Sequence, residues 1–292
     1  MRFSFEPSLG FIWQKILLLC TCMSDQNNNY TDSSFGLYQA YSYTLLIQVE
    51  ATSFNYAVVH QNRLVASAEG CELDELAHPK QLSDLLTGTY KKVIIGLPAT
   101  GLTLLPKSLF SEEQVADFAR FLDVKETEKV FAQNLDDKNI IIYKTADYIT
   151  EVVERYNLQN TVYTAEGWIK AIAKSSPLNS NLYLEIGKDT VQFLNFTSGD
   201  LRFYNTFEFK NADELVYFTT FVAQELELQS QQVTLVLSGD VAVGDKNMSK
   251  LTDFYPKIEI NGLKGIELPA QITSHNFLAL AALSLCGSSE EH

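Results

Sequence analysis

"NLYLEIGKDTVQFLNFTSGDLRFYNTF", residues 181–207, is the stretch that decides the predicted fold. It has three apolar runs separated by two short polar turns, and such runs between turn residues are typical of antiparallel strands. The stretch "TLLIQVEATSFNYAVVHQNRLVASAEG", residues 44–70, follows the same plan. When the two are aligned without gaps, Leu45 falls on Leu182 and Tyr56 falls on Phe193. The sequence therefore predicts two copies of a three-stranded unit.

The same elements follow each copy. The tripeptide Asp-Glu-Leu, at 74–76 and again at 213–215, lies near the start of a predicted helix. Buried strands are expected next, at 92–99 and 233–240. A helix that crosses between two strands of one sheet makes the fourth strand parallel to the first. The unit is therefore β-β-β-α-β, and its repetition predicts an α/β protein with two lobes built on mixed sheets.

Periodic apolar positions predict further elements. Ser111 and Gln114 form a possible capping box at the start of one helix, and Asn211 can cap another. The remaining predicted elements are strands at 129–135, 140–144 and 161–165, and helices at 111–122, 146–156, 166–174 and 274–286.

Composition shifts predict the domain borders. Ser175-Ser176-Pro177 is a plausible linker, which places the first lobe at 43–178 and the second at 179–288, with a tail at 289–292. Residues 1–42 are expected to form a disordered extension, because their middle part is rich in Asn, Ser and Asp.

The apolar run Ile16–Cys20 mimics a signal peptide, but it is short and no A-x-A site follows it. It is also too short to span a bilayer, so no stable membrane insertion is expected. We expect Met23 to be the true start and the protein to be cytoplasmic. Cleavage after the apolar run, and hence secretion, remains an alternative.

Composition also limits the classes of partner. The chain has 292 residues, of which 46% are hydrophobic, and a net charge of −14. An acidic surface repels nucleic acid and anionic lipid and favours a basic protein partner. The four cysteines, Cys20, Cys22, Cys71 and Cys286, form no zinc pattern with one another or with histidine, and we expect reduced thiols. No pattern of a catalytic nucleophile occurs.

Two β-β-β-α-β units in one chain resemble the actin-like ATPase superfamily, whose lobes are ribonuclease H-like. The segment "NIIIYKTADYITEVVERYNLQNTVYTAEGWIKAIAK", residues 139–174, is similar to the matching part of actin-like pilus-assembly and secretion proteins. Residues 91–122 have a similar Leu-Pro segment that leads into a helix. Residues 43–287 as a whole resemble an uncharacterised family of actin-like proteins from Bacteroidetes.

The resemblance implies a nucleotide site, because two Asp-x-Gly hairpins hold the phosphates and Mg²⁺ in that superfamily. In lobe two, Glu185-Ile186-Gly187 keeps the pattern with Glu for Asp. In lobe one, Gln48-Val49-Glu50 has lost both the acid and the glycine. A shift of two residues, to Glu50-Ala51-Thr52, restores an acid but no glycine. The candidate nucleotide-binding residues are Gln48, Glu50, Thr52, Glu185, Gly187, Lys188, Thr190, Ser238, Gly239 and Asp240.

The degenerate lobe-one hairpin favours a non-catalytic scaffold or partner-binding protein without a cofactor. Glu50 would also place negative charge beside an anionic ligand. The first alternative is an ATP-binding ATPase with atypical ligands for nucleotide and Mg²⁺. The second is a metal-dependent nuclease that uses Glu185, Glu214 and Asp240, although the net charge argues against a nucleic-acid substrate.

Plainer interpretations of the same residues also stand. Glu185 can be an ordinary hairpin residue that faces away from Leu184 and Ile186, and Ser238-Gly239 can simply end a strand. The dipeptide Gly187-Lys188 is not a P-loop, because the pattern needs Gly at 182, Ser or Thr at 189 and a following helix.

Overall fold

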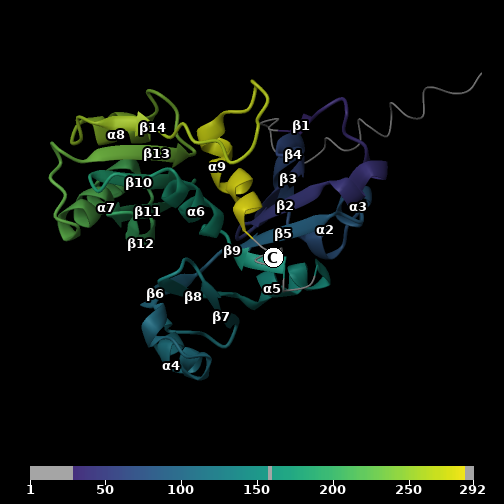
Figure 1. Cartoon of the computed structure of the whole chain (residues 1–292), viewed down its shortest axis with the longest axis horizontal. Coiled ribbons are helices and arrows are strands. Elements are labelled where there is room, and N and C mark those ends of the chain that lie inside the picture. Colours follow the sequence, from purple (N-terminus) through teal and green to yellow (C-terminus); the bar gives the residue numbers. More distant parts are fainter. Residues whose placement is uncertain (1–28, 157–159, 287–292) are drawn as a thin grey trace, which may run out of the picture.

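The alternating strands and turns of the two repeats form one six-stranded sheet and one five-stranded sheet, and the chain also has a smaller third sheet (Figure 1). The computed structural model describes residues 29–156 and 160–286. The first sheet has the order β1-β4-β3-β2-β5-β9, the second β12-β11-β10-β13-β14, and the third β6-β8-β7. The strands of the first sheet are β1 (Tyr30–Thr31), β2 (Thr44–Val49), β3 (Ser53–His60), β4 (Arg63–Glu72), β5 (Lys92–Leu97) and β9 (Thr161–Tyr163).

The second sheet repeats the first, with the same pairing. Its strands are β10 (Asn181–Ile186), β11 (Thr190–Thr197), β12 (Asp200–Glu208), β13 (Thr234–Gly239) and β14 (Ile258–Ile260). In each sheet the first three strands of the repeat are antiparallel neighbours, and the fourth pairs in parallel with the first. The predicted α/β fold with duplicated units on mixed sheets is therefore present.

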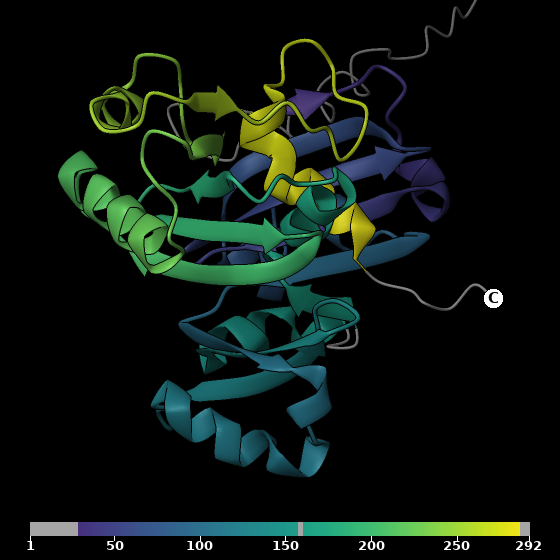
Figure 2. The same cartoon turned by 60° about the vertical axis from the view of Figure 1, so that its left-hand side comes forward.

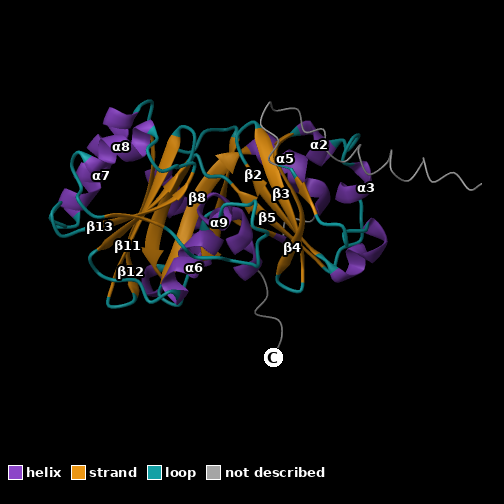
Figure 3. Cartoon of the chain, turned by 90° about the horizontal axis from the view of Figure 1, so that it is seen from above, coloured by secondary structure: helices purple, strands orange, loops and turns teal. Residues whose placement is uncertain are grey.

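The helices form the layers between and outside the sheets. Figure 3 shows α7 and α8 on the outer side of the second sheet, α2, α3 and α5 on the outer side of the first, and α6 and α9 between the sheets. The helices are α2 (Asp74–Ala77), α3 (Ser83–Leu86), α4 (Val115–Ala119), α5 (Asp147–Val153), α6 (Glu166–Lys174), α7 (Ala212–Glu225), α8 (Lys246–Thr252) and α9 (Ser274–Ala282).

The two central helices touch through their backbones. A Cβ atom on Gly167 of α6 would lie 2.3 Å from the carbonyl oxygen of Ala282 of α9, so only glycine allows this approach. The apolar side chains of Trp168 and Leu278 join the first lobe's core to residues of the second sheet, such as Tyr204. One hydrophobic cluster therefore extends from the first lobe onto the second sheet, beside a separate cluster within the second lobe.

The third sheet projects from the first lobe together with α4, at the bottom of the view in Figure 2. Its strands are β6 (Gly101–Pro106), β7 (Glu128–Asn134) and β8 (Asn139–Ala146). A buried ion pair of 2.8 Å joins Lys144 Nζ to Glu128 Oε2 at the base of this projection. Burial raises the pKa of Glu128, but hydrogen bonds from the Lys125 backbone, Lys144 and Thr100, together with the charge of Lys144, outweigh it and hold this pKa at about 2.

Two predicted helices differ from the structure. The expected helix 111–122 is a short α4 between two 3₁₀ turns, and the Ser111 side chain makes no capping hydrogen bond. Its apolar stripe, at Val115, Phe118 and Leu122, stays partly exposed, so packing does little to hold a longer helix. The helix expected after the first repeat is split into α2 and α3. In the second repeat the Asn211 cap is confirmed, because its Oδ1 accepts from Glu214 N at 3.0 Å.

The N-terminal region also differs from the expected disordered extension. Residues 30–42 were expected to be disordered, yet β1 pairs with β4 and a 3₁₀ helix spans Leu37–Ser42. Contacts of Phe35 and Leu37 with the core outweigh the polar composition there. Residues 1–28 and 289–292, with Met23, Cys20 and Cys22, lie outside the described residues.

The C-terminal helix is buried as predicted, but it packs against the first sheet as well as the second. Cys71 and Cys286 are both buried, and neither forms a disulfide within the described residues. No helix within residues 29–156 and 160–286 combines the length and apolar character needed to cross a membrane.

Candidate nucleotide site at the paired hairpins

The pairing of strands places the two candidate hairpins at equivalent positions. Val49 pairs with Phe54 in the first lobe, as Ile186 pairs with Val191 in the second. The parallel strand pairs show the same correspondence between the lobes, since Thr44 of β2 lies opposite Lys92 of β5 and Asn181 of β10 lies opposite Thr234 of β13. Gln48, Val49 and Glu50 therefore coincide with Glu185, Ile186 and Gly187, as the gapless alignment predicts. This pairing favours the gapless placement over the one shifted by two residues.

Glu185 points away from Leu184 and Ile186, as strand alternation requires, but it does not point to solvent. Only 8% of its surface is exposed, because it lies on the face of the second sheet that α6 and α9 cover. Trp168 of α6 donates its Nε1 hydrogen to Ser238 Oγ, at 3.3 Å, directly beside this carboxyl. The Oε2 atom of Glu185 has no hydrogen-bond partner.

This burial changes the chemistry of the carboxyl. Desolvation raises the pKa of Glu185 to about 8, and a hydrogen bond with Ser238 only partly opposes the rise. The side chain is therefore mostly protonated at neutral pH. A protonated carboxyl is a poor ligand for Mg²⁺, which prefers charged oxygen ligands and retained water.

The tip of the lobe-two hairpin is a tight turn with an exposed polar end. Gly187 N donates to Thr190 O at 2.8 Å, and the turn closes there. Lys188 and Asp189 are exposed, and β11 rather than a helix follows them. A Cβ atom on Gly187 would lie 3.0 Å from Thr190 Oγ1, so the turn has little spare room on that side.

Ser238 and Gly239 are the last two residues of strand β13, and Asp240 follows them. Gly239 has φ of +86°, and a Cβ atom there would lie 2.2 Å from Ile186 O. Asp240 N donates to the same carbonyl oxygen at 2.6 Å, while the Asp240 side chain is exposed. The glycine therefore allows β13 to end against β10, which agrees with the plainer interpretation of Ser238-Gly239.

The lobe-one hairpin is held by its own side chains. Glu50, at the position equivalent to Gly187, accepts hydrogen bonds from Ser53 Oγ at 2.8 Å and Asn55 Nδ2 at 2.9 Å. Its backbone N donates to Ser53 O at 2.9 Å, as the second hairpin does at Gly187. Gln48 is half-buried and Thr52 is exposed. The only acid of this hairpin is therefore used to stabilise the turn.

These residues do not fit a magnesium and phosphate clamp of the kind that the resemblance implies. One acid is buried and mostly neutral, and the other occupies the glycine position and is engaged locally. The nuclease set is not assembled either, because α7, which carries Glu214, packs on the sheet face opposite to Glu185. Among the residues that the structure describes, no three His, Cys, Asp or Glu side chains could together hold a metal ion.

Sequence reasoning missed the side chains that close the space above Glu185. Tyr204 of β12 and Tyr163 of β9 join the lobes through a hydrogen bond of 2.6 Å between their hydroxyl oxygens. Tyr204 also donates to Gln192 Oε1 at 2.8 Å. Both tyrosines and Trp168 are buried. Their separation along the chain leaves no local sequence signal that would have grouped them with Glu185.

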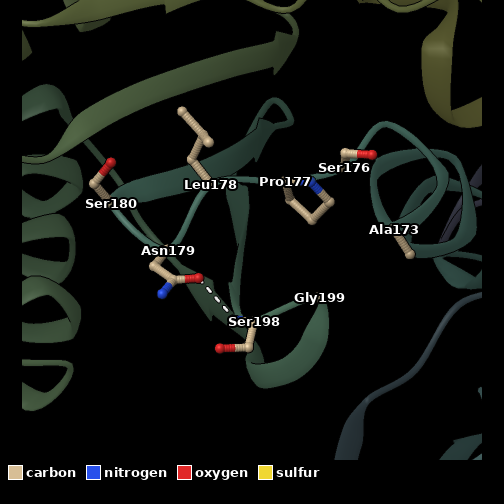
Figure 4. Close-up of a pocket in the computed structure, with 8 residues that line it drawn as sticks. All are labelled: Ala173, Ser176, Pro177, Leu178, Asn179, Ser180, Ser198 and Gly199. Carbon is tan, nitrogen blue, oxygen red and sulfur yellow. Dashed lines mark hydrogen bonds between the residues drawn. The ribbon is translucent and has the colours of Figure 1, made fainter.

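One open surface hollow, of about 680 Å³, lies away from the candidate hairpins, at the border between the lobes (Figure 4). In it, Asn179 Oδ1 accepts a hydrogen bond from Ser198 N at 2.8 Å. No charged residue lines it, and its lining residues are Ala173, Ser176, Pro177, Leu178, Asn179, Ser180, Ser198 and Gly199. The sequence-predicted site residues are therefore absent from this hollow.

Comparisons with known proteins agree with the two-lobe fold described above. The family model described as a protein of unknown function, DUF3822, matches residues 32–258. A Bacteroides thetaiotaomicron protein with an actin-like ATPase fold and unknown function has a TM-score of 0.68 at 20% identity, covering 87% of this chain and 100% of that chain. The PilM-PilN type IV pilus biogenesis complex gives 0.55 at 14% identity, covering 83% and 97%. No curated protein matches the chain. These likenesses confirm the predicted actin-like fold.

Proposed function

The chain belongs to the DUF3822 family of proteins of unknown function, and we propose that it is a non-catalytic actin-like protein that binds protein partners. The observation that carries this proposal is the burial of Glu185 under Trp168 and Tyr204. The better-preserved half of the phosphate clamp is thereby converted into part of the contact between the lobes. The other half, at Glu50, is a self-contained turn.

The energetics of Glu185 support a structural role for this residue. Ionising a carboxyl in an apolar setting costs free energy, which is why the pKa of Glu185 rises to about 8. A Mg²⁺ ion would have to displace the proton and also reach a side chain that the lobe-one helix α6 covers. Nucleotide binding at this position would therefore require the shared core of the lobes to open.

Partner binding is supported by the surface and by a relative. The net charge of −14 favours a basic protein partner over nucleic acid or anionic lipid. The structure that resembles this chain at a TM-score of 0.55 is a complex of two proteins, PilM and PilN. We place the protein in the cytoplasm, where the buried thiols of Cys71 and Cys286 would stay reduced.

A thermal-shift titration with MgATP tests the proposal. A site with a dissociation constant of about 0.1 mM would stabilise the protein by about 2.7 kcal/mol at about 10 mM ligand, which is easily seen as a higher Tm. We expect no rise in Tm beyond that given by magnesium and inorganic phosphate.

Two variants make the titration specific. Gly187→Glu places a negative charge at the hairpin, and Gly262→Glu adds the same charge where nothing lies within 4 Å of a new Cβ atom. A MgATP-dependent rise in Tm that Gly187→Glu abolishes and Gly262→Glu retains would contradict the proposal. It would instead support the alternative, an ATP-binding protein with atypical ligands.

A further inference from the structure

The carboxyl group of Glu185 lies where helix α6 of the first lobe packs on the second sheet (Figure 3). Two hydrogen bonds cross between the lobes beside it. Trp168 Nε1 donates to Ser238 Oγ at 3.3 Å. The hydroxyl oxygens of Tyr163 and Tyr204 lie 2.6 Å apart. We call this contact the seam, and it consists of Glu185, Ser238 and Tyr204 of the second lobe with Tyr163 and Trp168 of the first.

The hydrogen bonds around Glu185 fit a neutral carboxyl and not an ionised one. A carboxylate only accepts hydrogen bonds, and its two oxygens together accept about four. Among the described residues, the donor that acts on Glu185 is the Ser238 hydroxyl, which also lies 3.3 Å from Leu184 O. One hydroxyl has one hydrogen and cannot serve both, and no described group reaches the Oε2 atom of Glu185. A protonated carboxyl avoids this shortage, because it can itself donate to Ser238 Oγ.

No positive charge in the described part of the chain compensates for the missing donors. Burial and the Ser238 hydroxyl are the two influences on the pKa of Glu185. Tyr204 of β12 and Tyr163 of β9 face it, and burial raises the pKa of Tyr204 well above its ordinary value and that of Tyr163 to about 12. Both tyrosines therefore stay neutral where Glu185 titrates. The other titratable groups on the surrounding elements are Tyr183 of β10, Glu166, Lys170 and Lys174 of α6, His275 of α9, Asp200, Arg202 and Glu208 of β12, and Asp240 after β13.

The packing on either side allows the seam to loosen while both lobes stay folded. Leu184 and Ile186 belong to the separate hydrophobic cluster of the second lobe, on the sheet face opposite to Glu185. On the other side, α6 is held by α9, because Gly167 packs against the backbone of Ala282. Neither contact passes through the seam, so the seam can open as a local unit.

We propose that Glu185 is a proton-controlled latch, which keeps the seam closed when the carboxyl is protonated and loosens it when the carboxyl ionises. An ionised carboxylate needs water, and water reaches it when Trp168 moves away from Ser238. In the closed seam the pKa is raised to about 8, against an ordinary value of 4.5. Between these values the equilibrium constant for opening should rise by up to about tenfold per pH unit. The latch operates without a partner protein and therefore goes beyond the proposed function.

Hydrogen exchange of the Trp168 indole measures the opening, because its Nε1 hydrogen crosses the seam. Trp13→Phe leaves Trp168 as the only tryptophan of the chain, so NMR follows a single indole signal. From pH 6 to pH 8 we expect its protection, corrected for the intrinsic exchange rate, to fall roughly fiftyfold. Adding Glu185→Gln should make the protection independent of pH. Glu185→Met, which is also uncharged, provides the same test if Glu185→Gln does not fold.

A matched control and the backbone of α7 make the measurement specific. Asp189→Asn removes an exposed acid of the same hairpin and should retain the full pH dependence. Constant indole protection in the Trp13→Phe protein would overturn the latch, as would a fall that survives Glu185→Gln or disappears with Asp189→Asn. Indole protection that equals that of the best protected α7 amides, and falls with them, would also overturn it, because only the whole chain would then unfold. The MgATP titration tests the proposed function separately.

Discussion

Glu185→Gln should remove a pH-dependent loss of stability that the buried carboxyl causes. Gln has nearly the shape of a protonated Glu and carries no proton that can be released. The folded-state pKa of Glu185 is raised to about 8, while its ordinary value is 4.5. Below pH 4.5 both folded and unfolded chains hold the proton, and the carboxyl then brings no penalty. As the pH rises, the unfolded chain releases its proton first, so the wild type loses stability.

The magnitude follows from the two pKa values. Between them, the free energy of unfolding of the wild type should fall by about 1.4 kcal/mol per pH unit relative to the variant. The difference between the two proteins should therefore grow by about 3 kcal/mol from pH 5 to pH 8. The loss levels off above the folded-state pKa of about 8, where both states are ionised.

Urea unfolding of both proteins at pH 5, 6, 7 and 8, followed by circular dichroism, measures this difference. Groups that titrate in both proteins cancel, including Glu128, whose pKa of about 2 lies below the range. The values should converge towards pH 4.5, which is the internal control for any fixed effect of the amide. A difference that stays constant from pH 5 to pH 8 would refute the reasoning, because Glu185 would then titrate alike in folded and unfolded chains.

Three further predictions concern stability and are all measured by urea unfolding. Gly244→Ala should lower the free energy of unfolding by about 1–2 kcal/mol because of its φ of +83° alone. Gly239→Ala should lower it by about 1–3 kcal/mol more, because the new Cβ atom would also meet Ile186 O. Equal losses of stability in the two variants would contradict the close approach at Gly239. Tyr204→Phe should lower the free energy of unfolding by about 1–2 kcal/mol. In a double-mutant cycle with Tyr163→Phe the two losses should not be additive, since the two hydroxyl groups share one hydrogen bond. Simple additivity would contradict this hydrogen bond. Asn211→Ala should lower the free energy of unfolding by about 1 kcal/mol and Ser111→Ala by much less, since of these two side chains only Asn211 caps its helix. A larger loss for Ser111→Ala than for Asn211→Ala would contradict this assignment of the cap.

Much of the fold follows from local patterns. The repeat of three strands, the helix that follows and the parallel fourth strand are all written in alternation and turn residues. The observed pairing of Ile47 with Tyr56 and of Leu184 with Phe193 confirms the gapless alignment. The presence of Gln48 and Glu50 at the positions equivalent to Glu185 and Gly187 is likewise visible in the sequence alone, because it depends only on the alignment of the two repeats.

Other features depend on contacts between distant segments. The short strand at Tyr30–Thr31 exists because β4 offers it an edge, so polar composition misleads there. The expected helix 111–122 breaks into short turns, since no neighbour buries its apolar stripe. The position of β12 at one edge of the second sheet appears only when the strand order is known.

Glu185 shows most clearly where the two kinds of information divide. The sequence by itself determined that this side chain points away from Leu184 and Ile186, because successive residues of a strand alternate. It could not determine whether water or protein lies on that side. Only the tertiary structure places Trp168 and Tyr204 there, on a helix and a strand that meet across the lobes. Burial, which is a property of neighbours in space, therefore decides whether this carboxyl is an ionised ligand or a neutral part of the core.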